Sequence, residues 1–80
     1  MFYVYHIQSI KYPDQIYVGY TKNLKERLAC HNSGGSIYTS RYMPWKLIAY
    51  HAFEDELKAM KFEQYLKSQS GKAFAQKRLL

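Results

Sequence analysis

Residue types that could together hydrolyse a phosphodiester occur in ordered succession along this chain. Tyr5 and Tyr17 carry phenol groups that can donate or accept a hydrogen bond. Arg27 and His31 are four residues apart, which makes them neighbours on one flank of a helix. One carboxylate, Glu63, follows downstream. Proton-transfer groups, a permanent cation and a carboxylate that can bind a metal are the usual means of cutting a phosphate ester.

Glu63 is the first candidate because its position on its helix is unusual for a charged residue. It falls only about 40° around the helical wheel from Ala59, which belongs to the apolar arc. A carboxylate at such an edge needs a compensating cation. A single carboxylate suits Mg²⁺ or Mn²⁺, which keep most of their waters. The alternative is a glutamate that reaches the rim and pairs with one lysine.

The other candidates also have structural alternatives. The Arg27 guanidinium matches two phosphate oxygens, or it could bond a backbone carbonyl. His31 titrates near neutrality and can pass a proton, or it could be packed without a chemical role. Tyr5 and Tyr17 could activate a water beside a cation, or they could be sheet core.

These side chains need a scaffold, and the pattern predicts three strands within one domain, residues 1–80. Residues 2–7 and 16–20 are rich in β-branched and aromatic residues, and a short turn joins them as an antiparallel hairpin. Residues 45–53 form the third expected strand. Alternation would place on one face of the first strand Tyr3, Tyr5 and Ile7.

Helices are expected after the second and third strands. The first runs from Leu24 to near Asn32, with Thr21 or Asn23 as its cap. It should end before Ser33-Gly34-Gly35, because glycine is the usual left-handed terminator of a helix.

The second helix would begin after Glu54 or Asp55 and run to about residue 68. Residues 34–43 are expected to be a loop, and residues 72–80 a short terminal helix. The most economical arrangement is an α/β fold of the α+β type, a three-stranded antiparallel sheet flanked by helices.

Charge and composition favour a polyanionic partner. The 12 Lys and Arg exceed the 6 Asp and Glu, which gives a formal net charge of +6. Such an excess favours nucleic acid, although it also serves solubility. We expect five residues to contact the bases and phosphates of the nucleic acid: Lys22, Tyr38, Arg41, Lys67 and Lys72.

Other classes of protein are disfavoured. A single cysteine, Cys30, allows no intrachain disulfide and no zinc cluster. The start of the chain lacks the pattern of a signal peptide, and no stretch approaches the 18 apolar residues of a membrane span. We therefore expect a cytoplasmic protein with no membrane partner.

Taken in order, these motifs resemble the GIY-YIG nuclease superfamily. Tyr3-Val4-Tyr5 resembles the GIY element and Tyr17-Val18-Gly19 the YIG element. Arg27, His31 and Glu63 fall where members carry the catalytic arginine, a His or Tyr, and the metal-binding glutamate. The chain is most similar to small single-domain bacterial members that resemble the N-terminal nuclease domain of the bacterial DNA-repair excinuclease.

This resemblance implies hydrolysis of one DNA strand per site with one Mg²⁺ or Mn²⁺. It implies that Tyr5 activates the attacking water and that Tyr17 orders the water or a phosphate oxygen. Arg27 would neutralise charge on the phosphoryl group, His31 would relay a proton, and Glu63 would hold the metal.

Three functions stay open from the sequence. The first is a metal-dependent DNA endonuclease, which could act in repair or recombination and within a larger repair complex. The second is a nucleic-acid-binding module with the same fold and little or no cleavage. The third is a protein-docking domain that uses its tyrosine face.

Overall fold

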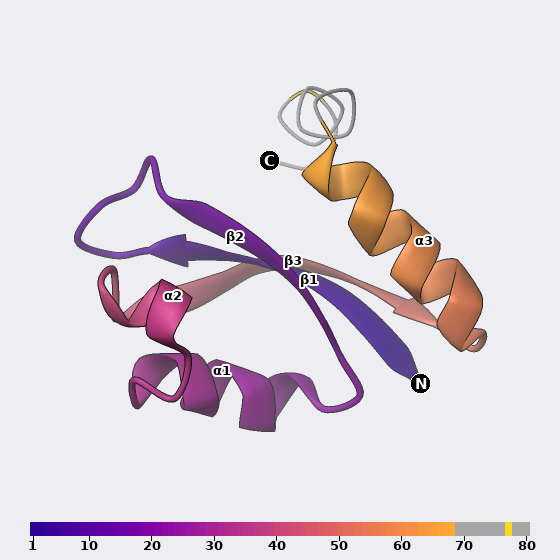
Figure 1. Cartoon of the computed structure of the whole chain (residues 1–80), viewed down its shortest axis with the longest axis horizontal. Coiled ribbons are helices and arrows are strands. Elements are labelled where there is room, and N and C mark those ends of the chain that lie inside the picture. The colour runs from indigo at the N-terminus through magenta and orange to yellow at the C-terminus, as the bar shows by residue number, and fades with distance from the viewer. Residues whose placement is uncertain (69–76, 78–80) are drawn as a thin grey trace.

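Three strands form one antiparallel sheet in the computed structural model, which describes residues 1–68 and residue 77. They are β1 (Phe2–Ser9), β2 (Ile16–Thr21) and β3 (Trp45–Phe53), and their order in the sheet is β2-β1-β3. The hairpin of β1 and β2 is confirmed, and β3 pairs with the other side of β1 (Figure 1).

Three helices accompany the sheet in the described part of the chain. Helices α1 (Leu24–Asn32) and α2 (Ile37–Ser40) connect β2 to β3, and α3 (Glu56–Lys67) follows β3. Figure 1 shows α1 and α3 on either side of the strands. The predicted class, a three-stranded antiparallel sheet flanked by helices, is confirmed.

Alternation along β1 divides the core between the two faces of the sheet. Val4 is buried against Ala59 and Leu66 of α3. Its neighbour Tyr5 is buried with Ile7 on the opposite face, against the half-buried leucines of α1. The predicted division of the β1 side chains between two faces is thus confirmed.

A β-bulge in β3 changes which of its side chains lie on each face of the sheet. The register shifts between His6 and Ile7 of β1, so that Ala49 pairs with the first and Leu47 with the second. Ile48 is the extra residue between them. As a result Trp45 and Phe53, which regular alternation would place on the same face, lie on opposite faces: Trp45 on the α1 side and Phe53 on the α3 side.

The helix ends follow the capping rules. Asn23, not Thr21, caps α1, and its side chain accepts a hydrogen bond from the Glu26 backbone N–H at 3.0 Å. The predicted glycine terminator is confirmed, and of the two candidates Gly34 is the one with a positive φ, +79°. Asp55, not Glu54, caps α3.

One prediction is wrong: residues 34–43 are not all loop, because they contain α2. Thr39 of this short helix is buried, and its carbonyl accepts a hydrogen bond from Trp45 Nε1 at 2.9 Å. This hydrogen bond joins α2 to the start of β3, six residues along the chain, and stabilises the turn. The expected helix over residues 72–80 lies outside the described residues.

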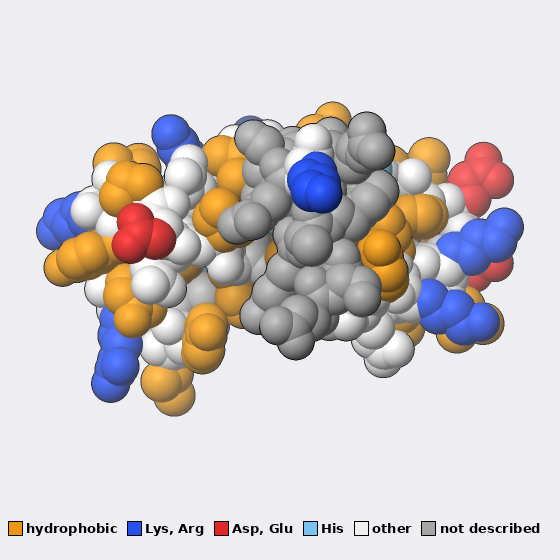
Figure 2. All heavy atoms as spheres, turned by 90° about the horizontal axis from the view of Figure 1, so that it is seen from above, with side chains coloured by type: hydrophobic (Ala, Val, Ile, Leu, Met, Phe, Trp, Pro, Cys, Tyr) orange, Lys and Arg blue, Asp and Glu red, His pale blue; other side chains and the backbone are white. Residues whose placement is uncertain are grey.

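Charged side chains are spread over the surface. On the face that Figure 2 shows, Lys and Arg stand out towards both ends of the molecule, with some acidic side chains near them. None of the helices in the described part of the chain has the length and apolar character needed to cross a membrane.

Candidate active site

A buried chain of three hydrogen-bonded side chains forms the centre of the site. Tyr5 Oη lies 2.8 Å from His31 Nε2, and His31 Nδ1 lies 2.7 Å from Thr39 Oγ1. All three residues are buried. The contacts allow two arrangements of hydrogens, one with Tyr5 donating to His31 and one with His31 donating to Tyr5. This Tyr5–His31–Thr39 chain can therefore move a proton in either direction.

The residue opposite Tyr5 has to be glycine. Gly19 pairs with Tyr5 across β1 and β2, and a Cβ added to Gly19 would overlap the Tyr5 hydroxyl and ring. The absence of a side chain on β2 lets the Tyr5 ring lie across that strand. Its hydroxyl then reaches His31 on α1.

Tyr17 lies beside this chain and joins it to two further elements. Its ring centroid is 5.4 Å from that of His31 and 5.7 Å from that of Tyr38 on α2. The Lys67 ammonium of α3 lies 5.2 Å from the centroid of the Tyr17 ring. Tyr17 thus lies where α1, α2 and α3 meet the edge of the sheet.

Burial fixes the resting protonation states of the two central groups. Burial raises the pKa of the Tyr5 phenol, and the neighbouring Tyr17 raises it further. The positive charge of Arg27 lowers the same pKa but does not cancel the increase. Burial also lowers the pKa of His31, and Arg27 lowers it further. At neutral pH the site therefore contains a protonated phenol next to a neutral imidazole, which is a donor facing an acceptor.

Glu63 reaches this site from the other side of the sheet. Its side chain is only 22 % exposed, and its carboxylate lies 3.4 Å from the Lys67 ammonium that also covers Tyr17. The negative charge of Glu63 helps to raise the pKa of the Tyr5 phenol, which places the carboxylate within electrostatic reach of Tyr5. Glu63 does not point away into bulk solvent.

The donor set at Glu63 fits a largely hydrated Mg²⁺ or Mn²⁺. Residues 1–68 and 77 contain no group of three or more His, Cys, Asp or Glu side chains that could enclose a metal. Mg²⁺ commonly binds one or two carboxylates together with waters and substrate phosphates. Glu63 supplies such a carboxylate, and its present partner is an exposed lysine that a divalent ion could displace.

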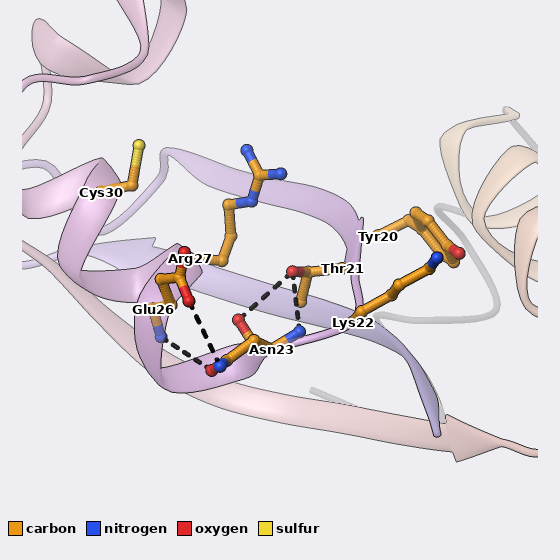
Figure 3. A pocket seen from close by; sticks show the side chains of 7 residues that line it. All are labelled: Tyr20, Thr21, Lys22, Asn23, Glu26, Arg27 and Cys30. Carbon is orange, nitrogen blue, oxygen red and sulfur yellow. Dashed lines mark hydrogen bonds between the residues drawn. The ribbon is translucent and has the colours of Figure 1, made fainter.

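Arg27 lines a hollow of about 570 Å³ at the start of α1, next to this centre. Figure 3 shows its side chain extending from the helix, clear of the bonded pair Asn23 and Glu26. Lys22 lines the same hollow, and its ammonium lies 5.7 Å from the centroid of the Phe2 ring. Two cations on one hollow suit a phosphate chain that passes Arg27.

The sequence-predicted residues differ in how closely they converge. Tyr5, Tyr17 and His31 are in direct contact. Glu63 is connected to them through Lys67, and Arg27 acts on them through its charge.

The expected nucleic-acid contacts lie at the edge of this cluster. Tyr38 and Arg41 line a second, smaller hollow, whereas Lys72 lies outside the described residues. Sequence reasoning missed Thr39. The run Ser36 to Ser40, which can cap and form one helical turn after two glycines, is the signal that could have pointed to it.

Comparisons with known proteins identify the family of this chain. The model of the GIY-YIG catalytic domain matches residues 1–78. A UPF0213 protein of Pediococcus acidilactici is 47% identical over 60 residues, which cover 71% of this chain and 61% of that protein. A UPF0213 protein of Streptococcus pyogenes is 38% identical over 66 residues, covering 81% and 70%. The match thus spans less than two thirds of the Pediococcus relative.

A named nuclease and a solved structure are also similar. The structure-specific endonuclease subunit SLX1 homolog of Giardia intestinalis is 37% identical over 60 residues, which cover 70% of this chain and 17% of that protein. The solution NMR structure of a UPF0213 protein from Bacillus halodurans superimposes with a TM-score of 0.57 at 32% identity, covering 96% of this chain and 84% of the other. Because the family model matches nearly the whole length of this chain, the chain belongs to the GIY-YIG catalytic domain family.

Proposed function

We propose that this chain is a metal-dependent DNA endonuclease domain that hydrolyses one strand at a time. The observation that carries the proposal is the Tyr5–His31–Thr39 chain, with Tyr17 packed against it. A protonated phenol and a neutral imidazole, with charges of both signs nearby, are suited to acid–base work on a phosphate ester.

Proton transfer would run through Tyr5. The phenol has a raised pKa, so a free phenolate is disfavoured at neutral pH. Tyr5 can instead take the proton of the attacking water while it passes its own to His31 Nε2. Thr39 holds the other ring nitrogen and fixes the orientation of the imidazole. The net result of the two transfers is that one proton moves from the water to His31.

The remaining residues would bind and neutralise the phosphate. Arg27 supplies a permanent positive charge for the phosphoryl oxygens, and Tyr17 supplies a phenol for a phosphate oxygen or the water. Glu63 would hold the divalent ion. When bound there, Mg²⁺ or Mn²⁺ supplies Lewis-acid stabilisation of the charge that develops on the phosphate.

The name of the Giardia relative, a structure-specific endonuclease subunit, supports a substrate that is recognised by its structure. The substrate that we propose is branched or damaged DNA. A role in repair or recombination, within a larger complex and in the cytoplasm, is part of the same proposal. Phosphate contacts by Lys22, Arg41 and Lys67 would dominate DNA binding.

Nicking of supercoiled plasmid in Mg²⁺ or Mn²⁺ tests the proposal, with EDTA as the metal-free reference. We expect Glu63→Gln to lower the nicking rate at least about a hundredfold, the size of losing one strong transition-state contact. Glu54→Gln is the matched control, because Glu54 is an exposed carboxylate just before α3. It should cut at the wild-type rate.

Other outcomes would identify the alternatives. The Glu63–Lys67 ion pair favours a binding module if a divalent ion cannot displace the lysine. In that case the protein binds plasmid, flap and junction DNA but cuts none of them in any metal. Absence of DNA binding even at low salt would contradict both proposals and favour a protein partner.

A further inference from the structure

Helix α2 is anchored at one residue and exposed at two others. Thr39 is buried and bonds to both His31 and Trp45. The two residues before it, Ile37 and Tyr38, are 92 % and 71 % exposed. We call this exposed pair the α2 tip. An adjacent pair of large, mostly apolar side chains in water marks a contact surface more often than scattered single residues do.

The α2 tip adjoins the proposed cleavage site. The Tyr38 ring meets the Tyr17 ring with centroids 5.7 Å apart, and the Tyr17 ring in turn meets His31. Lys67 lies over the same Tyr17 ring. Whatever contacts the α2 tip is therefore within one side chain of the groups proposed to act on the phosphate.

A small hollow accompanies the α2 tip. It measures about 270 Å³ and is lined by Ile37, Tyr38, Arg41 and Tyr42. That is just below the range of about 300–1,000 Å³ for small-molecule sites, so it suits one flat group rather than a chain. Its lining combines aromatic surface with one guanidinium, which is the pairing that single-stranded nucleic acid uses.

A nucleobase fits this surface better than a peptide does, because of where the surface lies and how it is charged. Arg41 and Lys67 flank the tip with positive charge, and the chain carries a net charge of +6. In a continuous duplex the faces of each base are covered by neighbouring bases. An exposed tyrosine can stack only on a base that has left the stack.

We propose that the α2 tip receives a nucleobase that has left the base stack of DNA, beside the phosphate to be cut. The protein then prefers DNA with an unpaired base at a single-strand–duplex junction over continuous duplex. This inference rests on the proposed DNA endonuclease function and adds to it the feature that selects the substrate.

The test measures binding and not cleavage. A fluorescent adenine analogue, 2-aminopurine, is placed at the unpaired position of a flap oligonucleotide and at the same position in a continuous duplex, both in EDTA. We expect quenching of its fluorescence on the flap and a dissociation constant about tenfold lower than for the duplex, as one stacked base would give.

Two variants of the α2 tip decide the result. Tyr38→Ala and Ile37→Ser change exposed side chains, so folding should be retained, and circular dichroism checks this. At least one of them should reduce the preference for the flap to about twofold or less. The matched controls are Tyr50→Ala on β3 and Leu57→Ser on α3, which are also exposed and should keep the preference.

Three results would overturn the inference. The wild-type protein could bind flap and duplex equally, or both tip variants could keep the wild-type preference for the flap. The third is that the tip variants lose the same amount of affinity for the flap as for the duplex. The failure of this inference is distinguishable from that of the nuclease proposal, because plasmid nicking in Mg²⁺ is scored separately. A protein that nicks plasmid but shows no flap preference loses only this inference.

Discussion

At the scale of single residues, the site depends on a few side chains that leave no room for change. The Tyr5 hydroxyl reaches His31 only because Gly19 has no side chain, and His31 keeps its orientation because Thr39 bonds its second nitrogen. These contacts are buried, so an unpaired atom there would cost about 1–3 kcal/mol.

Gly19→Ala should damage both stability and cutting. The added Cβ displaces the Tyr5 ring, and overpacking of this kind costs about 1–3 kcal/mol. We expect urea unfolding to show that loss, together with at least about a tenfold slower nicking rate. In Gly19→Ala/Tyr5→Leu the overlapping ring is gone, so the two stability effects should not add. Additive effects would contradict the assigned contact.

Thr39→Val tests the outer end of the hydrogen-bonded chain. Valine keeps the shape of threonine but leaves His31 Nδ1 without its partner. We expect a loss of about 1–3 kcal/mol in the free energy of unfolding, and slower nicking. Ser40→Ala is the control on the same helix, since the Ser40 hydroxyl bonds locally to Ile37 and not to His31. Equal effects of the two substitutions would rule out the specific role of Thr39.

At the scale of elements, the contact between α3 and the sheet determines where Glu63 lies. Val4, Ala59 and Leu66 form the buried part of that contact. It also contains His6, which is 1 % exposed and whose two ring nitrogens have no hydrogen-bond partner, and His51, which packs on the ring of Phe62. The α3 contact therefore includes one imidazole, that of His6, whose protonation costs stability because burial lowers its pKa.

The free energy of unfolding should fall as the pH drops below about 6.5. Burial, followed by the charge of His51, lowers the folded-state pKa of His6 from its ordinary value of 6.5. The unfolded chain binds the proton more readily, so the stability contribution is complete above pH 6.5 and is lost as pH falls towards the folded-state pKa. His6→Leu should flatten this dependence in urea titrations between about pH 5 and 7.5, the range around the ordinary pKa of histidine. A profile parallel to wild type would contradict it.

At the scale of the whole molecule, three helices bring charge and aromatic surface to one edge of the sheet. Helix α1 contributes Arg27 and His31, α2 contributes Tyr38, and α3 contributes Glu63 and Lys67. Since α1 and α3 pack on opposite faces, the site forms only at the β2 edge, where the faces meet.

DNA binding should weaken steeply with salt, because phosphate contacts release counterions. Four described cations near the site, at positions 22, 27, 41 and 67, would give a log–log slope of about −3.6 for duplex DNA. Lys22→Ala should reduce that slope by about 0.9, whereas Lys58→Ala, an exposed lysine on α3, should leave it unchanged. Fluorescence anisotropy between 50 and 200 mM salt, roughly the range over which such contacts are lost, measures both. A flat salt dependence would exclude phosphate-dominated binding.

The strands, most of the helices and the family can be recognised from the residues alone. The strand composition, the cap at Asn23 and the terminator at Gly34 depend on residues a few positions apart, so their signals are local. The same holds for the tyrosine motifs, and the match to the GIY-YIG family confirms that interpretation.

How those residues meet depends on the folded chain. The bulge at Ile48 puts Trp45 on the α1 side and Phe53 on the α3 side, although regular alternation would place both on the same face. The contact of His31 with Thr39 and the position of α2 depend on packing against Trp45. These contacts span eight and six residues, and they join separate elements, α1 to α2 and α2 to β3. Their free energy comes from burial and pairing that exist only once the sheet has formed, and no local periodicity encodes them.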